Sequence, residues 1–478
     1  MSAFGRAVIA LLTPVMVAFG PVLPRSGPEA DPALPPAPIY RLRIAVRTTA
    51  PKARIKLRRP AELIQGALLR SRGNLRASWG TFGRGPLVVA KRHGTSRATA
   101  VYLVAVTPGP SQRVRFLSSG HRQGSTLIRI DNANGSTPSR LGTVGHVGPR
   151  AKRFSLPLAR VAAGGPPPGT EPLSPQVLAF YYPWYEPPDW SGGKPIADDN
   201  RIAEPYSSGD PAVIDRHIEQ ARSAGIDGFV ASWWGREIGW DANTRMLLGR
   251  TPPGFTFALY VEIFSPYFRT VTDLIEELDH ALDTYAASDR YLRIDGRPVL
   301  YIFSSHNVLT DVGTPGMTPG YEVIWEFVRQ ELTIRGHDPM LIGEGRPFSV
   351  SDFDVFDGMH VYGTDDPTQT YRLDREMALT ARAWAAIHGG RRRIWASSVI
   401  PGYDDRHIQG RTPDYFPRED GRLYEEQWNA AIASQSDQAL IVSFNEWMET
   451  TNIEPNVEWG TKYLDLTAAL SRRFRTSR

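Results

Sequence analysis

Two glutamates three positions apart follow the last strongly apolar segment of the chain, residues 438–443. The next six residues, 444–449, read Phe-Asn-Glu-Trp-Met-Glu, with the acids at Glu446 and Glu449. A carboxylate buried without a partner is costly, so acids in this place are a poor choice for stability alone. Apolar rings for a sugar face and acids for proton transfer are, however, what cleavage of a glycosidic bond requires. The hexapeptide therefore predicts the catalytic centre of a glycosidase.

The spacing of the two acids sets a condition on the backbone. Residues i and i+3 of a continuing strand point to opposite faces, so we expect the chain to turn after Phe444. Glu446 and Glu449 would then lie close enough for one carboxylate to raise the pKa of the other, which yields one acid and one base. The alternative interpretation is a pair of loop acids exposed to water.

Other kinds of chemistry find little support in the chain. The 478 residues include no cysteine, which excludes disulfides, a cysteine nucleophile and thiolate metal sites. No glycine-rich phosphate loop, His-Glu-x-x-His motif or serine-centred elbow is present, which argues against phosphoryl transfer, zinc hydrolysis and acyl transfer. We expect no cofactor and no metal.

Charge divides the chain into two modules. Residues 41–170 hold 24 Lys and Arg against two acids, Glu62 and Asp131, although the whole chain carries a net charge of only +5. Short apolar runs separated by Gly, Pro, Ser and Asn predict a small all-β, sandwich-like domain in this basic part. The expected organisation is a signal peptide or N-terminal anchor at 1–24, a proline-rich linker at 25–39, a basic β-rich accessory domain at 40–161, a Pro/Gly linker at 162–174 and a second domain at 175–478.

The first residues have the pattern of an export signal. Arg6 precedes an apolar run at 7–20 that is short for a bilayer span. We therefore expect an exported protein that is extracellular, periplasmic or associated with the cell surface. Whether the signal is cleaved or kept as an anchor stays open.

From about residue 175 the pattern alternates between strand and helix. The clearest helix begins at Pro211, with Asp210 as its cap and Gly225 as its stop. The eight expected strands are 177–185, 228–234, 256–264, 298–303, 340–343, 355–362, 394–400 and 439–444. Eight such units predict an α/β fold of the (β/α)8 TIM-like barrel class, with a doubly wound sheet as the alternative.

In such a barrel the carboxyl ends of the strands carry the active site. Aromatic and acidic residues recur at these ends, which favours a ligand site over a set of isolated core residues. The candidate substrate-binding residues are Tyr181, Tyr182, Trp184, Trp233, Trp234, Glu262, His360, Tyr362, Tyr403, Asn445 and Trp447. His217 lies on the apolar face of its helix and is interpreted as a core histidine. Glu344 and the pair Asp365–Asp366 could equally be loop acids or members of the site.

Several of these motifs, in this order, resemble glycoside hydrolase family 99. Residues 205–211, His217 and residues 224–235 resemble the front half of that family's barrel. Residues 443–455, Ser-Phe-Asn-Glu-Trp-Met-Glu-Thr-Thr-Asn-Ile-Glu-Pro, resemble its signature near the carboxyl end. The resemblance covers about 175–475 and does not reach the basic domain.

The family contains endo-acting α-mannosidases and α-mannanases, which cleave with retention of configuration and need no metal. The resemblance implies that Glu446 engages the sugar 2-hydroxyl and helps to form a 1,2-anhydro sugar intermediate, while Glu449 is the general acid/base. It also implies substrate contacts by Glu262, Tyr403 and one of Tyr181 or Tyr182, and an aromatic wall from Trp233 or Trp234. This chain departs from the family at Met448, where the family usually has His, and at Thr450, where it usually has Gly.

The leading hypothesis is an exported retaining endo-α-glycosidase that hydrolyses α-mannan-type glycans with endo-α-1,2-mannosidic linkages. Two alternatives stay open: a non-catalytic glycan-binding protein of the cell surface, and a retaining glycosidase of another α-linked polysaccharide. An ordinary double displacement by Glu262 and Glu446 would need carboxyls about 5 Å apart. The expected partners are the glycan substrate and, through domain 40–161, an anionic cell-envelope polymer, with no nucleic acid.

Overall fold

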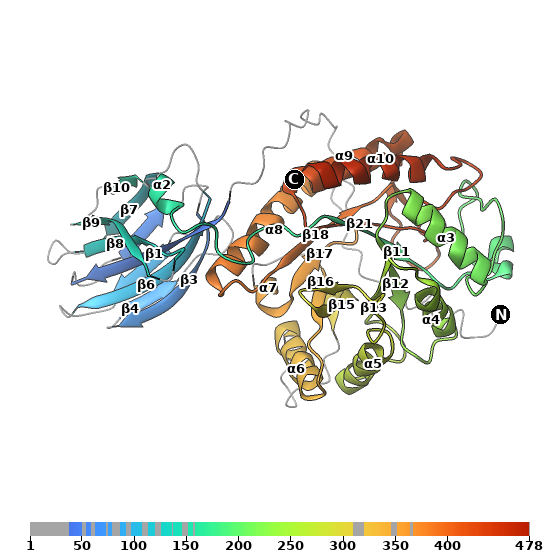
Figure 1. Ribbon diagram of the computed structural model, residues 1–478, viewed down its shortest axis with the longest axis horizontal. Coiled ribbons are helices and arrows are strands. Elements are labelled where there is room, and N and C mark those ends of the chain that lie inside the picture. Colours follow the sequence, from blue (N-terminus) through green and yellow to red (C-terminus); the bar gives the residue numbers. More distant parts are fainter. Residues whose placement is uncertain are drawn as a thin grey trace.

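The computed structural model describes most of the chain from residue 38 onward (Figure 1). The described residues are 38–49, 54–58, 63–72, 75–78, 87–91, 97–107, 113–119, 126–135, 137–145, 152–155, 158–308, 320–345, 351–363 and 367–477. The predicted signal segment 1–24, nearly all of the linker 25–39, and Asp365–Asp366 lie outside them. Among the described residues, no helix combines the length and apolar character that crossing a membrane requires.

The basic part of the chain forms two antiparallel sheets of five strands each. The first has the order β3 (Leu63–Arg72), β6 (Ala98–Val106), β1 (Tyr40–Thr48), β8 (Thr126–Asn132) and β9 (Ser139–Val144). The second has the order β10 (Lys152–Ser155), β7 (Arg113–Ser119), β2 (Arg54–Arg58), β5 (Leu87–Lys91) and β4 (Leu75–Ser78). Alternate residues of β1, among them Leu42, Ile44 and Val46, are fully buried in a core that Phe154 of β10 also contacts. The predicted all-β domain is present.

Eight parallel strands close into a barrel in the rest of the chain. They are β11 (Gln176–Tyr181), β12 (Gly228–Trp233), β13 (Thr256–Glu262), β15 (Arg297–Phe303), β16 (Met340–Glu344), β17 (Gly358–His360), β18 (Ile394–Val399) and β21 (Gln438–Ile441). The pairing of β13 with β15 completes the ring, and the short β14 (Arg293–Ile294) adds an antiparallel edge. The predicted fold class, a TIM-like barrel preceded by a β domain, is confirmed.

Helices surround this barrel (Figure 1). They are α3 (Pro211–Ser223), α4 (Asp241–Arg250), α5 (Val271–Thr284), α6 (Tyr321–Ile334), α7 (Asp352–Val355), α8 (Pro367–Ile387), α9 (Arg422–Ser434) and α10 (Lys462–Thr476), with α2 (Leu158–Val161) before the barrel. The sequence signals of α3 act as expected: the Asp210 side chain accepts a hydrogen bond from the Ala212 N–H at 2.8 Å, and Gly225 follows at φ 76°. The strand expected at 355–362 is wrong at its start, because Val355 ends α7 and the strand begins at Gly358.

Alternation along the strands decides which side chains face the barrel interior. Phe180 and Tyr182 belong to the inner apolar cluster, together with residues from the other strands. Ala179 and Tyr181 belong to the outer cluster, between the strands and the helices. Two neighbouring residues of a strand therefore differ in position: one side chain faces the barrel interior, and the next packs between the strands and the helices.

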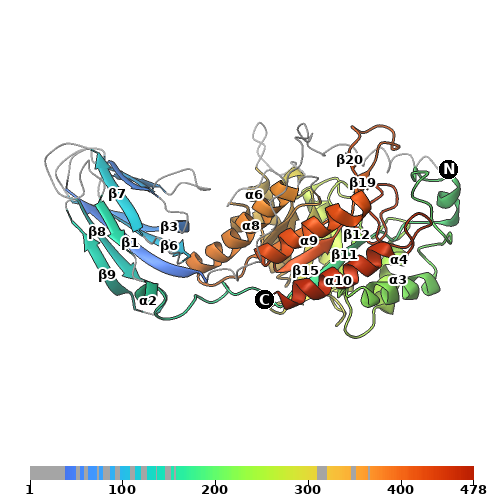
Figure 2. The same ribbon diagram turned by 90° about the horizontal axis from the view of Figure 1, so that it is seen from above.

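The β domain contacts the barrel through α8 (Figure 2). Ile39 and Ala105 form a small buried cluster with Ala383, Ala386 and Ile387 of that helix. Small side chains on both partners allow the sheet and the helix to approach closely, so the two domains share an apolar contact.

Candidate active site

The chain turns immediately after the last barrel strand, as the spacing of the two acids requires. The Ser443 hydroxyl accepts a hydrogen bond from the Glu446 N–H at 2.7 Å, and the Thr451 N–H donates to the Glu446 carbonyl at 3.2 Å. Glu446 is 2% exposed, whereas the side chain of Glu449 is 17% exposed. The turn thus leaves one acid buried and presents the other towards solvent.

The buried acid, Glu446, is held by two donors on one oxygen. The Tyr185 hydroxyl donates to Oε1 at 3.1 Å, and the Met448 N–H donates to the same atom at 3.0 Å. Burial, followed by the charge of Glu449, raises the pKa of Glu446 to about 8, and the two donors oppose that rise. Glu446 is therefore a carboxyl with unusually high proton affinity, which suits a base that receives a hydroxyl proton.

The second acid, Glu449, accepts from a cation and from a phenol. Arg411 Nη1 lies 2.8 Å from Glu449 Oε1, and the Tyr362 hydroxyl donates to Oε2 at 3.2 Å. The hydroxyls of Tyr182 and Tyr362 are 2.8 Å apart. Because Tyr362 gives its one proton to Glu449, Tyr182 must be the donor between the two phenols. Both phenols thereby orient the exposed carboxyl.

Arg411 comes from the loop after β18 and was not among the sequence candidates. Its Nη1 also lies 3.3 Å from the Tyr403 hydroxyl and 3.3 Å from Asp405 Oδ2, and Tyr403 donates to Asp405 at 3.0 Å. A buried acid needs a cation or hydrogen-bond donors nearby. Asp405 was therefore the residue in the sequence that could have pointed to Arg411. Tyr185 was also missed, although it ends the aromatic run of the first strand.

Glu262 is a further buried carboxyl at the same end of the barrel. The Ser232 hydroxyl donates to its Oε1 at 2.7 Å, and the Trp234 indole N–H donates to the Ser232 oxygen at 3.2 Å. Burial, helped by the charges of Glu449 and Glu344, raises the pKa of Glu262 to about 8. Glu262 is therefore mostly protonated at neutral pH and can donate a hydrogen bond.

His360 is buried among the rings of Phe180, Tyr260 and Tyr301, with centroid distances of 5.7, 5.7 and 6.1 Å. Burial lowers the pKa of His360 to about 3, so the ring is neutral. Its Nδ1 lies 3.2 Å from the Val361 carbonyl, which places the ring proton on that nitrogen. His360 is therefore an uncharged ring in the interior of the barrel.

The aromatic candidates divide into two groups. Tyr182, Trp184 and Trp234 belong to the inner cluster, with Tyr182 and Trp184 centroids 4.8 Å apart and Trp184 and Trp234 centroids 6.4 Å apart. In the two pairs that the sequence left open, Tyr182 and Trp234 face the barrel interior, whereas Tyr181 and Trp233 do not.

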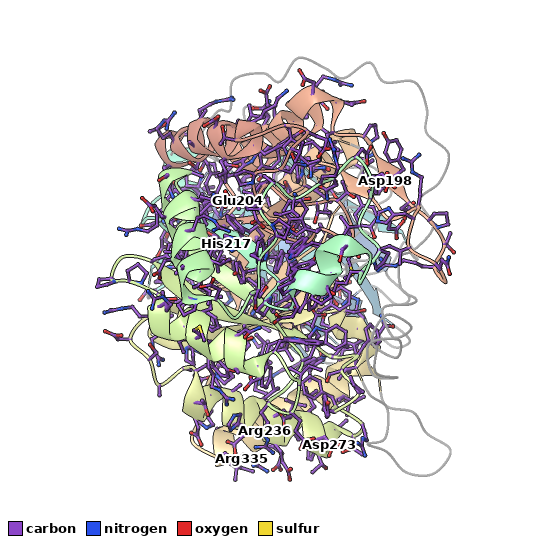
Figure 3. The ribbon with its side chains drawn as sticks, turned by 90° about the vertical axis from the view of Figure 1, so that its right-hand side faces the viewer. Asp198, Glu204, His217, Arg236, Asp273 and Arg335 are labelled. Carbon is purple, nitrogen blue, oxygen red and sulfur yellow. The ribbon has the colours of Figure 1, made fainter. Side chains whose placement is uncertain are left out.

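Tyr181 and Trp233 point elsewhere, which corrects the expectation that all the aromatics converge. Tyr181 bonds to His217 Nδ1 at 3.0 Å, and the Trp233 indole donates to Asp241 at 2.9 Å, because both side chains lie on the outer face of their strands. Trp447 belongs to the inner cluster, where its indole is fully buried and donates to Glu454 at 3.0 Å. His217, on α3 in Figure 3, is buried, as expected of a core histidine.

Asn445 positions the backbone of the first strand instead of facing a ligand. Its side-chain oxygen accepts from the Tyr182 N–H at 2.7 Å, and its amide nitrogen donates to the Tyr182 carbonyl at 3.0 Å. These two hydrogen bonds join the segments that carry Tyr182 and Glu446 and so fix the relative position of the two sides of the site.

The two residues that depart from the family pattern differ in their effect: Thr450 strains the backbone, whereas Met448 contacts Glu446 through its backbone N–H. Thr450 adopts φ 54°, in the left-handed region that a β-branched residue rarely enters and that glycine enters freely. The usual glycine at this position is therefore explained by the backbone. Met448 is 4% exposed in the inner cluster, and its contact with Glu446 is made by the backbone N–H, which any residue except proline supplies.

Among the described residues, the grouping whose donor atoms lie close enough for a metal ion is Asp279, Asp283 and His337. Asp279 and Asp283 come from α5 and His337 follows the end of α6, and Arg335 (labelled in Figure 3) pairs with Asp279 at 3.0 Å. The group does not include Glu446, Glu449 or Glu262.

A closed parallel barrel whose strand ends carry buried carboxyls beside aromatic rings defines a glycoside hydrolase in class. Comparison with known families is more specific: the sequence profile of glycosyl hydrolase family 99 matches residues 201–471, more than half of the 478 residues. The chain belongs to that family and is a glycoside hydrolase.

Similar proteins agree with this assignment. The glycoprotein endo-alpha-1,2-mannosidase of Rattus norvegicus is 26% identical over 338 residues, 62% of this chain and 71% of the relative. The protein of the same description from Xenopus laevis is 25% identical over 395 residues, 71% and 81% of the two chains. A solved GH99 endo-alpha-mannosidase of Bacteroides thetaiotaomicron is 24% identical, covers 63% of this chain and 98% of its own, and has a TM-score of 0.52, which supports the fold.

Proposed function

We propose that this chain is a retaining endo-α-mannosidase that cleaves α-1,2-mannosidic linkages within larger glycans. The observation that carries the proposal is the pair formed by Glu446, buried with a pKa of about 8, and Glu449, partly exposed on the same turn. The relatives named endo-alpha-1,2-mannosidase support the substrate class.

In the proposed reaction Glu446, when ionised, accepts the proton of the sugar 2-hydroxyl. The 2-oxygen attacks the anomeric carbon while Glu449 gives its proton to the departing glycosidic oxygen, so that a 1,2-anhydro sugar forms. Glu449 then takes a proton from water, the water oxygen attacks the anomeric carbon and displaces the 2-oxygen from it, and Glu446 returns a proton to the 2-oxygen. Two inversions at one carbon give net retention, and both acids end as they began.

Each donor on the two acids has a place in this scheme. The Tyr185 hydroxyl and the Met448 N–H stabilise the carboxylate of Glu446, which the first step requires. Tyr362 and Arg411 orient Glu449, and the aromatic rings of Tyr182, Trp184 and Trp234 supply apolar faces for sugar rings. Glu262, protonated near neutral pH, can donate to a sugar hydroxyl.

The test is product release from a panel of polysaccharides that includes α-1,2-linked, α-1,6-linked and unrelated α-linked chains. The Glu449→Gln variant should lose cleavage of α-1,2-linked mannan by at least about a thousandfold and stay folded. Glu458→Gln is the matched control, because Glu458 lies in the same segment and pairs with exposed Arg201 at 2.7 Å. Wild-type turnover by Glu449→Gln would end the assignment of that residue. Cleavage of another α-linked chain in preference to mannan would refute the substrate class.

The intermediate has its own test. A 2-deoxy-2-fluoro-α-mannosyl fluoride has no 2-hydroxyl, so an anhydro route cannot begin with it and no covalent adduct should appear in the intact mass. An adduct on Glu262 or Glu446 would show an ordinary double displacement. Binding of mannan by the wild type without any release of reducing ends would favour a glycan-binding protein.

We also propose that the chain is exported, on the grounds of Arg6 and the apolar run at 7–20. Cell fractionation with N-terminal sequencing of the mature protein checks this. Recovery of the full-length chain in the cytoplasmic fraction alone would contradict it.

A further inference from the structure

Cross-strand pairing in the first sheet of the β domain brings arginines together on one face. Directly opposed residues of an antiparallel pair point to the same side of a sheet. Arg47 of β1 is opposed by Thr99 of β6, and Thr99 is in turn opposed by Arg72 of β3. On its other side, Arg47 is opposed by Leu127 of β8.

The next two rows of the sheet add more arginines to the same face. Ala45 is opposed by Arg129 on one side and by Val101 on the other, and Val101 is opposed by Arg70. Arg43 is opposed by Asp131, which is opposed by Arg140 of β9. We call the set the arginine face: Arg43, Arg47, Arg70, Arg72, Arg129 and Arg140.

This face is the outer side of the domain. The intervening residues of β1, Leu42, Ile44 and Val46, are buried in the domain core, so the arginines lie on the opposite side. Arg47, Arg70, Arg72 and Arg140 are exposed. The contact with α8 uses Ala105, with Leu103 beside it, and leaves these four side chains open.

Almost nothing within the domain neutralises this charge. Asp131 is one of only two acids between residues 41 and 170, and it pairs with Arg129 Nε at 2.7 Å. Within the described part of the chain, no ion pair is recorded for the other five arginines. Like charges gathered on one face repel one another, so folding alone gives no reason for this arrangement.

We propose that the arginine face binds an acidic polysaccharide, a linear glycan that carries phosphate or carboxylate groups along its length. Guanidinium groups bind these anions through two parallel hydrogen bonds. Arg47, Arg129 and Arg140 follow a diagonal across neighbouring strands, where such neighbours are about 7–8 Å apart, so the charges form a track suited to an extended chain.

A lipid surface fits the face less well. Binding at a bilayer interface requires inserted apolar or aromatic side chains, and among the described residues of these strands the exposed large apolar side chains are Leu127 and Leu69, the latter at the irregularity beside Arg70. The choice of a glycan also rests on the proposed function, because a domain that holds an acidic glycan would keep the barrel near its polymeric substrate.

The test measures binding of the full chain to polygalacturonate and to a phosphate-bearing mannan by titration calorimetry at 0.15 M salt. The variant carries Arg47→Gln, Arg70→Gln and Arg72→Gln. The matched control carries Arg222→Gln, Arg269→Gln and Arg472→Gln, three exposed barrel arginines for which no ion pair is recorded in the described chain. We expect affinity to fall at least tenfold in the first triple variant and to change less than twofold in the control, which has the same net charge.

Equal losses in both triple variants would show a diffuse charge effect and overturn the proposal. Tighter binding to phosphatidylglycerol vesicles than to either polysaccharide would overturn it in favour of a membrane surface. Hydrolysis of a short neutral mannoside reports on the barrel separately and should be unchanged in both triple variants. If the wild type lacks that hydrolysis yet binds the acidic glycans, the proposed function fails and the arginine face stands.

Discussion

The hydroxyl of Tyr185 favours the ionised form of Glu446, and its removal should shift the pH dependence of the reaction. The hydroxyl donates to Glu446 Oε1 at 3.1 Å and accepts the Trp447 N–H at 2.9 Å. Tyr185→Phe keeps the ring and deletes both bonds. Because the hydroxyl favours the carboxylate, its loss raises the pKa of Glu446 above its value of about 8.

The size of the shift follows from the kind of bond that is lost. A hydrogen bond to a charged group contributes about 1.5–3 kcal/mol, and one pKa unit corresponds to about 1.4 kcal/mol. The pKa of Glu446 should therefore rise by about 1–2 units. Below this pKa the rate follows the ionised fraction, so kcat/KM at pH 7 should fall about 10- to 100-fold, whereas the loss at pH 10 should be smaller.

The assay is kcat/KM for an α-1,2-linked manno-oligosaccharide between pH 5 and pH 10. Tyr206→Phe is the matched control, since the Tyr206 hydroxyl donates to a different buried carboxyl, Glu454, at 2.9 Å. Both variants lose one phenol bond to a buried acid, but only Tyr185→Phe should move the ascending limb of the profile. Thermal unfolding separates this effect from the cost of the unpaired Trp447 N–H, about 1–3 kcal/mol.

Three results would refute the reasoning. A folded Tyr185→Phe variant whose ascending limb coincides with that of the wild type would show that Glu446 is not the group that titrates. An equal shift in Tyr206→Phe would show that the effect is a general response to a lost buried hydroxyl. A uniform fall in rate at every pH would likewise assign Tyr185 to positioning alone.

Glu262→Gln should stabilise the protein at high pH. Between about pH 4.5 and 8 the carboxyl of Glu262 keeps its proton in the folded state but loses it in the unfolded state. The free energy of unfolding of the wild type therefore falls as pH rises through that window. The gain at pH 9 is at most about 4–5 kcal/mol and should vanish at pH 4, as checked by urea unfolding at both pH values; an equal gain at pH 4 would contradict it. Thr450→Gly should raise the free energy of unfolding by about 0.5–1 kcal/mol, since it relieves the left-handed φ of 54° but frees the unfolded chain. A lower midpoint of thermal unfolding would show that the Thr450 hydroxyl bond to the Asp404 carbonyl, at 3.3 Å, matters more than the strain.

The architecture was predictable because strand and helix patterns alternate clearly after residue 175. Asp210, Pro211 and Gly225 marked the limits of a helix before any fold was assumed, and the turn after Phe444 followed from the spacing of two acids. These signals are local: each depends on a few neighbouring residues and on the geometry that those residues prefer.

The parts of the site that the sequence did not reveal depend on the pleat of each strand and on the path of the loops. Neighbouring pairs such as Tyr181–Tyr182 and Trp233–Trp234 look alike in sequence, and only the position of each residue in its strand decides which ring faces inward. Arg411 lies in a loop well after its strand, so no periodicity links it to Glu449. Asn445 was interpreted as a ligand contact because its partner, the Tyr182 backbone, lies 263 positions away, and no local pattern in the sequence indicates that pairing.

That last contact has a consequence for the order in which the site is assembled. The first barrel strand is synthesised before the segment that carries Asn445, Glu446 and Glu449, and the Asn445 side chain bonds to the Tyr182 backbone across 263 positions of the chain. A growing chain therefore holds its aromatic residues and Glu262 long before it holds a reaction centre. The two sides of the candidate site therefore meet only when the ring of strands closes.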